Sequence, residues 1–257
     1  MMVSDNEVVP LPPLTIKQVP ALNAITWTKK GFQLFRENPA MWIILFVIYL
    51  IIMVPISMIP GIGSIASTLL APVFAAGLMW GCQAITREQD LEINHLFAGF
   101  KKNTRQLILV GAIYMVSLLV IAVFVIMSLD KATIETMMKG QELNPAQAGA
   151  MMLPLLIAMF FLVPVIMAYW FAPVLAGLHN LAAVDAMRLS FNACLRNILP
   201  FMLYGLIFMG LLVVSIIPFG LGLVIVVPWM MTSLYASYAD IFNIPLANLT
   251  TQPSDQT

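Results

Sequence analysis

The side chains that most often carry out catalysis or bind metals are few in this sequence, and they lie far apart. It contains two histidines, His95 and His179, and two cysteines, Cys82 and Cys194. None of them has the spacing of a zinc motif, a Cys-x-x-Cys redox motif or a His-Glu-x-x-His helix. We therefore expect two reduced thiols packed as small apolar side chains, two histidines at the membrane interface, and no metal or other cofactor.

One set of titratable residues would serve an enzyme if the fold brought its members together at the cytoplasmic surface: Glu92, His95, His179 and Asp185. Their spacing does not require this. The sequence has no Gly-x-Ser-x-Gly elbow and no phosphate-binding P-loop. The long apolar segments hold no Asp, Glu, Lys, Arg or His in their interiors, although such residues usually mark pumps and ion-coupled transporters. We predict that the protein is not an enzyme, and ion-coupled transport is disfavoured.

Composition indicates a membrane protein. Of the 257 residues, 61% are hydrophobic and 9% are charged, against roughly 45–50% and 25% in soluble domains. A membrane-spanning helix needs about 20 mainly apolar residues, and six segments meet that requirement: residues 40–59, 64–84, 106–129, 150–177, 199–217 and 221–239. We predict an all-α integral membrane protein with six transmembrane helices. Its 12 basic and 12 acidic residues balance, which gives no reason to expect a nucleic-acid partner.

The distribution of basic residues predicts the orientation. Ten of the 12 Lys and Arg residues precede the first, third or fifth span, and only Lys131 and Lys139 lie in another connection. Because basic connections stay in the cytoplasm, we predict that both termini are cytoplasmic and that residues 130–149 face outward. Polar compositions at 1–20 and 243–257 predict disordered tails, which leaves one transmembrane domain at 21–242.

Three related units are predicted within that domain, at about residues 21–84, 91–177 and 181–242. Before each pair of spans a basic residue lies close to an asparagine: Arg36 to Asn38, Lys102 to Asn103, and Arg196 to Asn197. The second span of each unit contains a proline, and we predict helix kinks at these positions, Pro72, Pro173 and Pro228. The pattern predicts three hairpins in a threefold parallel repeat, each preceded by a cytoplasmic amphipathic helix.

The predicted amphipathic segments, residues 23–37, 92–105 and 181–197, separate apolar from polar residues on a helical wheel. Aromatic and aliphatic side chains on one face and basic ones on the other are typical of a helix in the membrane interface. Such segments either anchor the hairpins or recognise anionic lipid headgroups or another membrane protein. Eight residues are candidates for these contacts: Lys29, Lys30, Arg36, Lys101, Lys102, Arg105, Arg188 and Arg196.

Four segments carry a family resemblance. They are residues 71–79 (APVFAAGLM), 95–100 (HLFAGF), 190–197 (SFNACLRN) and 234–242 (LYASYADIF). With them the chain, from about residue 24 to 242, resembles a family of uncharacterised proteobacterial multipass (six-helix) inner-membrane proteins. The resemblance implies a location in the inner membrane of a Gram-negative bacterium, and it implies no catalytic or binding residues.

Two functions remain open from the sequence. The first is a non-enzymatic inner-membrane protein that acts through interaction with lipids or membrane partners. The alternative is a passive or lipid-type transporter whose path lies between the Pro-kinked helices.

Overall fold

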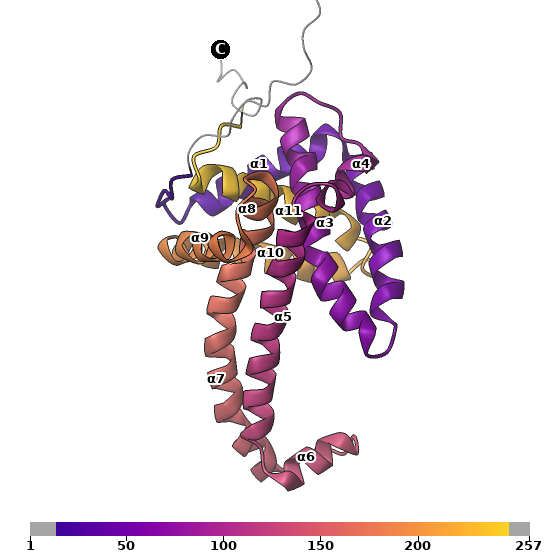
Figure 1. The fold of residues 1–257 in the computed structure, drawn as a ribbon, viewed down its shortest axis with the longest axis vertical. Helices are drawn as coiled ribbons and strands as arrows, with labels where there is room; N and C mark the ends of the chain where they lie inside the picture. The colour runs from indigo at the N-terminus through magenta and orange to yellow at the C-terminus, as the bar shows by residue number, and fades with distance from the viewer. Residues whose placement is uncertain (1–13, 247–257) are drawn as a thin grey trace, which may run out of the picture. The chain divides into compact units, whose positions relative to one another are not determined.

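The fold is built from membrane-length helices. The computed structural model describes residues 14–246, and within them the chain forms helices and no strand. Six helical segments are long and apolar enough to cross a membrane: α2 (Pro39–Ser57), α3 (Ile62–Thr86), α5 (Thr104–Met127), α7 (Pro145–Trp170) with α8 (Ala172–Leu178), α10 (Ile198–Ile216) and α11 (Leu223–Ile241). These six helices, labelled in Figure 1, confirm the predicted number of spans.

Shorter helices connect the spans: α1 (Asn23–Glu37), α4 (Ile93–Leu96), the 3-10 turn η1 (Ala98–Phe100), α6 (Lys131–Met138) and α9 (Ala183–Arg196). The segment at 92–105 differs from its prediction, because two short turns take the place of one amphipathic helix. Asn103 adopts the left-handed conformation at φ 54°, which interrupts a right-handed helix.

Contacts divide the chain into two compact units. One contains residues 14–50, Gly77–Leu96 and 196–246, and the other contains Ile51–Ala76 and Phe97–Leu195. The single domain at 21–242 stays a prediction. The predicted tails lie mostly at 1–13 and 247–257, outside the described residues. Residues 14–20 belong to the first unit, where the Lys17 backbone N–H donates to the Ile241 carbonyl at 2.8 Å and Val19 is buried.

In the first unit, α1 runs antiparallel to α11. The Trp229 indole donates to the Thr28 carbonyl at 2.9 Å, and the Thr232 hydroxyl donates to the Gly31 carbonyl at 2.8 Å. A Cβ at Gly31 would overlap the backbone of Ser233. Glycine therefore permits the close helix approach here, and α1 buries its apolar face against α11 and α10.

In the second unit, α5 and α7 lie side by side as a long hairpin, and α6 lies across its end (Figure 1). The rings of Tyr114 and Tyr169 pack with centroids 4.5 Å apart. Helix α9 contacts the same hairpin through Ser190, whose hydroxyl donates to the Met167 carbonyl at 2.7 Å and accepts from the Phe171 N–H at 2.9 Å.

The three repeated prolines do not occupy equivalent helical positions. Pro72 lies inside α3 and Pro228 inside α11. Pro173 instead lies in the first turn of α8, after a break at Phe171. Proline is well accommodated there because the first turn of a helix needs no N–H from it. Two of the three predicted kink positions are thus inside continuous helices, and the third adjoins a helix break.

Candidate functional site

The eight basic candidates lie on the segments that lead into three of the spans. Seven of their side chains are exposed and Lys30 is half-buried. Helix α1 carries Lys29, Lys30 and Arg36, and α9 carries Arg188 and Arg196. Lys101 and Lys102 lie between η1 and α5, and Arg105 lies in the first turn of α5. The segments precede α2, α5 and α10, as the sequence predicts.

Most of these positive charges form no ion pair with a carboxylate of the described residues. Within residues 14–246, no carboxylate forms an ion pair with the basic side chains of α1 or α9, or with Arg105. The Arg36 guanidinium instead lies 5.9 Å from the centre of the Phe32 ring.

The asparagine that follows each basic segment helps to fix the start of the next span. Asn38 accepts a hydrogen bond at Oδ1 from the Met41 N–H at 3.1 Å and so caps α2. Asn103 donates from Nδ2 to the Ala176 carbonyl at 2.6 Å. The repeated pattern of a basic residue near an asparagine was visible in the sequence, but the bonding partners were not.

The third asparagine, Asn197, is buried and holds the N-terminal segment. Its Oδ1 accepts from the Val19 N–H at 2.9 Å, and its Nδ2 donates to the Lys17 carbonyl at 3.1 Å. Both amide groups are thus used, as a buried polar side chain requires. The role of Asn197 is structural, and it links the start of α10 to the segment before α1.

Asp240 is a half-buried residue that the sequence pattern did not predict. The predicted sixth span ended at residue 239, whereas α11 continues to Ile241 and includes this carboxylate in its last turn. Oδ2 of Asp240 accepts hydrogen bonds from Asn23 Nδ2 and Trp27 Nε1, both at 2.7 Å. Because Asn23 begins α1, the carboxylate also lies beside the positive end of that helix dipole. The geometry makes Asp240 an acceptor that joins α1 to α11.

The four residues considered for an enzyme belong to different units. Glu92 and His95 lie in the first, where the Glu92 N–H donates to His95 Nδ1 at 2.9 Å. His179 and Asp185 lie in the second. Burial lowers the pKa of His179 to about 4, so this imidazole is neutral near pH 7. The part of the chain that the structure describes holds no group of three or more His, Cys, Asp or Glu side chains that would bind a metal.

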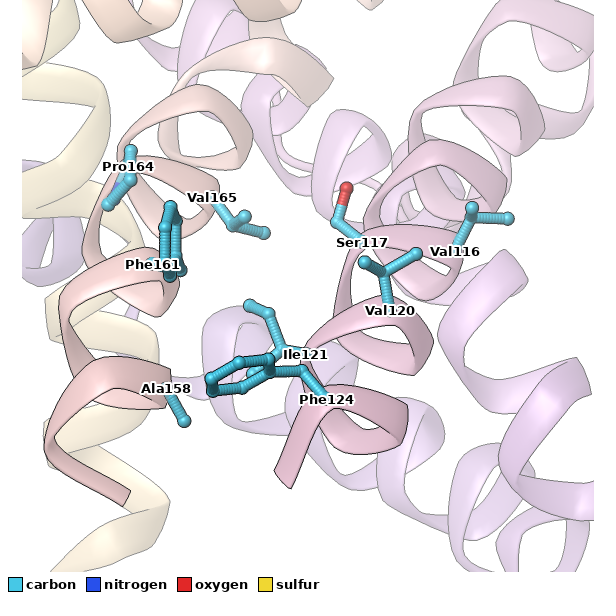
Figure 2. Close-up of a pocket in the computed structure, with 9 residues that line it drawn as sticks. All are labelled: Val116, Ser117, Val120, Ile121, Phe124, Ala158, Phe161, Pro164 and Val165. Atoms are coloured by element: carbon cyan, nitrogen blue, oxygen red, sulfur yellow. The ribbon is translucent and has the colours of Figure 1, made fainter. Parts of the chain in front are cut away.

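An apolar groove runs between α5 and α7 in the second unit (Figure 2). Its volume is about 440 Å³, within the range of roughly 300–1,000 Å³ typical of ligand pockets. It is lined by Val116, Ser117, Val120, Ile121, Phe124, Ala158, Phe161, Pro164 and Val165. The sequence predicted a path between Pro-kinked helices, but the proline in this groove is Pro164 and not one of the repeated three.

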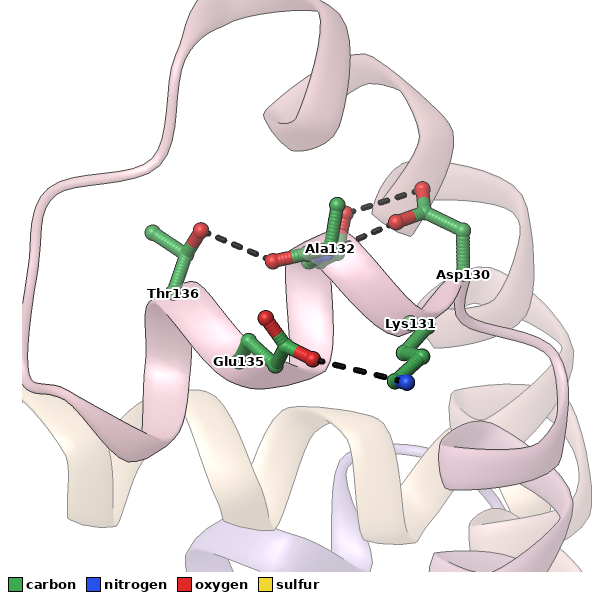
Figure 3. A network of polar contacts seen from close by, with 6 residues as sticks. Asp130, Lys131, Ala132, Glu135 and Thr136 are labelled. Atoms are coloured by element: carbon green, nitrogen blue, oxygen red, sulfur yellow. Dashed lines mark hydrogen bonds and ion pairs between the residues drawn. The ribbon is translucent and has the colours of Figure 1, made fainter.

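Helix α6 lies in the segment that the sequence analysis treated only as a polar connection. Asp130 caps its N-terminus by accepting from the Thr133 N–H at 2.7 Å and hydroxyl at 3.0 Å, and Lys131 pairs with Glu135 at 3.9 Å (Figure 3). These hydrogen bonds lower the pKa of Asp130. The same helix carries Ile134, Met137 and Met138, of which the two methionines are exposed. Apolar residues spaced by three and four were the signal for this amphipathic helix.

Comparison with known proteins places the chain in a family. No family model and no solved structure matches it. A probable inner membrane protein of Burkholderia thailandensis is 33% identical to it over 204 residues, which cover 76% of this chain and 75% of the relative. The chain belongs to this family of proteobacterial inner-membrane proteins.

Family membership and the six membrane-length helices support each other. They confirm the resemblance inferred from the sequence and the prediction of a multipass inner-membrane protein. Neither the name of the relative nor the six helices identify a reaction or a ligand.

Proposed function

We propose that this protein is a non-enzymatic inner-membrane protein that acts by binding anionic lipids, or a membrane partner, through its three basic segments. The observation that carries the proposal is the exposure of basic side chains that form no ion pair with a carboxylate of the described residues. They are Lys29 and Arg36 before α2, Arg105 at the start of α5, and Arg188 and Arg196 before α10. If each span crosses the bilayer once, the starts of the first, third and fifth spans share one side. The positive-inside rule makes that side, and both termini, cytoplasmic.

The cytoplasmic surface of the membrane suits such residues. Anionic headgroups attract basic segments by about 1 kcal/mol for each Lys or Arg near the surface. Eight such residues provide a substantial total, although every contribution falls as salt increases. The apolar side of α1 packs against α11 and α10, which leaves Lys29 and Arg36 exposed. The packed helix thereby holds its basic residues at a fixed surface.

The helix contacts also support the proposed threefold repeat. Helix α1 leads the first repeat (residues 21–84), and it packs on α11, the second span of the third repeat (residues 181–242). The η1 turn leads the second repeat (residues 91–177). It approaches α3, the second span of the first repeat, where a Cβ at Gly99 would overlap the Val73 carbonyl. Helix α9 leads the third repeat, and it contacts α7, the second span of the second repeat, through Ser190. Each leading segment thus packs on the second span of the preceding repeat, and the first repeat follows the third in this order.

A matched pair of variants tests the function. The triple variant Lys29→Gln, Lys30→Gln and Arg36→Gln removes positive charge from α1, and the control Lys131→Gln with Lys139→Gln removes it from the connection predicted to lie outside. Each protein is purified from vesicles of phosphatidylethanolamine and phosphatidylglycerol, and retained lipids are counted by native mass spectrometry. The α1 variant is expected to retain less phosphatidylglycerol than wild type, and the control to retain the same amount. Equal retention in all three proteins contradicts the lipid proposal.

The groove between α5 and α7 favours a second candidate, a passive lipid-type transporter. Its Pro164 removes one hydrogen bond of the α7 ladder, and an apolar groove open to the bilayer suits a lipid chain. Proteoliposomes containing a fluorescent phospholipid test this candidate by dithionite bleaching. If the protein transports lipid, dithionite should bleach more than the half of the fluorescent phospholipid that lies in the outer leaflet, and bleaching should approach completion. Bleaching that stops at the level of protein-free vesicles removes the candidate.

A further inference from the structure

We propose that the groove between α5 and α7 holds one acyl chain of a phospholipid from the membrane leaflet on the side of α6. This inference shares its ligand class, lipid, with the proposed function, but it concerns a different site and does not require the basic segments.

The position of the groove places it at membrane depth. Its lining on α5 runs from Val116 to Phe124. Helix α5 ends at Met127, so these residues lie in the half of the span that is nearer to α6. The Tyr114–Tyr169 ring pair lies on α5 and α7 just beyond the end of the groove that points away from α6. Surrounding molecules at this depth are lipid chains rather than water.

The lining is chemically matched to hydrocarbon. Eight of its nine side chains are apolar, and the ninth, Ser117, already donates its hydroxyl to the Ile113 carbonyl at 2.8 Å. No ionisable group lines the groove. Val120 and Phe161 are 63% and 53% exposed, so the groove opens at the surface of its unit, and a chain can enter it sideways from the bilayer.

The size of the groove favours a chain over a helix. From Val116 to Phe124 the lining extends about 12 Å along α5 at 1.5 Å per residue. The volume of about 440 Å³ over that length gives a mean cross-section of about 37 Å². A helix about 10 Å across covers ~80 Å². The groove is therefore too narrow to enclose a helix from a partner or from a second copy, whereas a slender hydrocarbon chain fits inside it.

Packing, rather than a hydrophobic driving force, retains the chain. Lipid tails are as apolar as leucine, so transfer from bilayer to groove gains little by desolvation. An empty groove would, however, leave its walls without van der Waals partners. Beyond the groove, α6 lies across the hairpin end (Figure 1) with Met137 and Met138 48% and 83% exposed. Such an apolar face suits the interfacial layer that holds the headgroup of the same lipid.

The test fills the groove. Ala158 lines it and is 9% exposed, so Ala158→Phe places a ring in the space that the chain would occupy. Ala122 is exposed on α5 but does not line the groove, and Ala122→Phe is the matched control. Ala158→Leu fills less space and serves if the phenylalanine disturbs folding. Wild-type and variant proteins are purified from phosphatidylethanolamine vesicles, and lipids retained per chain are counted by native mass spectrometry.

We expect wild type and Ala122→Phe to retain one phospholipid more per chain than Ala158→Phe, with Ala158→Leu in between. Equal retention in folded wild type, Ala158→Phe and Ala158→Leu overturns the inference. A change of oligomeric mass in the Ala158 variants, without loss of lipid, overturns it in favour of an interface between copies. The outcome is separable from the proposed function, because the α1 charge variant is expected to keep this lipid while losing preference for phosphatidylglycerol.

Discussion

The indole nitrogen of Trp27 donates a hydrogen bond to Oδ2 of Asp240 at 2.7 Å, which joins the first helix of the chain to the last turn of α11. The same oxygen accepts from Asn23 Nδ2. Trp27 is completely buried and packs against Phe201 with ring centroids 5.3 Å apart. One carboxylate thus fixes the N-terminal turns of α1 against the C-terminal end of α11.

Replacing Asp240 with Ala should destabilise the first unit. The substitution leaves the Trp27 and Asn23 donors without their acceptor, and an unsatisfied buried donor costs about 1–3 kcal/mol. Thermal unfolding in detergent should therefore show a lower Tm for Asp240→Ala and a smaller decrease for Asp240→Asn, which keeps an acceptor oxygen. The exposed Asp90 provides the control, Asp90→Ala. Equal Tm values for all the proteins would show that this acceptor is unimportant.

The crossing of α1 and α11 should tolerate no side chain at Gly31. A Cβ there would overlap the Ser233 backbone, whereas a Cβ at Gly210 meets nothing within 4 Å. Gly31→Ala should therefore separate the helices and weaken the Thr232–Gly31 hydrogen bond, at a cost of about 1–3 kcal/mol. Gly210→Ala should be neutral or slightly stabilising, because alanine is the better helix former. The comparison is again made by thermal unfolding, and a Gly31→Ala protein as stable as Gly210→Ala contradicts the close approach.

The six spans could be predicted because the bilayer restricts what a chain can do. A segment that crosses hydrocarbon must satisfy its own backbone and remain apolar for about 20 residues, so composition alone locates it. Ends are less constrained. Asp240 was placed outside the sixth span because a charge reads as a boundary, yet two neutral donors from α1 stabilise it inside the last helical turn.

The sites were harder to predict because they depend on side chains from separate segments. Residues 92–105 have the periodicity of one helix, but the backbone leaves helical geometry at Phe97 and again at Asn103, which is left-handed and bonds the Ala176 carbonyl. The groove needs α5 and α7 to face each other over Ser117 and Pro164. Neither segment alone reveals such a facing surface, since both are apolar on all sides.

Cys194 should resist alkylation in the folded protein. It is 5% exposed, and burial raises the pKa of its thiol to about 12, so little thiolate forms at pH 8. Treatment with N-ethylmaleimide in native membranes should label this residue slowly, and denaturation in sodium dodecyl sulfate should restore rapid labelling. A Cys82→Ala background isolates the signal. Rapid labelling of Cys194 under native conditions would be inconsistent with a buried α9 face.

The stability of the second unit should depend on pH through His179. Burial lowers the pKa of its imidazole from the ordinary 6.5 to about 4. Because the unfolded chain takes up the proton first, stability decreases as pH falls from about 6.5 towards 4 and does not depend on this residue above that range. The Tm of wild type should decrease more between pH 7.5 and pH 5 than that of His179→Gln. Titration by NMR provides the direct check. A His179 imidazole that titrates near 6.5 in the folded protein would show that this residue does not cause the pH dependence of stability.

The proposed orientation, with both termini cytoplasmic, predicts opposite accessibility for two lysines. Lys29 precedes the first span and Lys139 follows α6, so an odd number of crossings, three, separates them along the chain. In a background without Cys82 and Cys194, a membrane-impermeant maleimide added to intact spheroplasts should label Lys139→Cys but not Lys29→Cys. Disruption of the membrane should make both react. Labelling of Lys29→Cys alone in intact spheroplasts would invert the topology and move the basic segments away from the anionic cytoplasmic surface. Labelling of both would mean that one of the three intervening apolar helices does not cross.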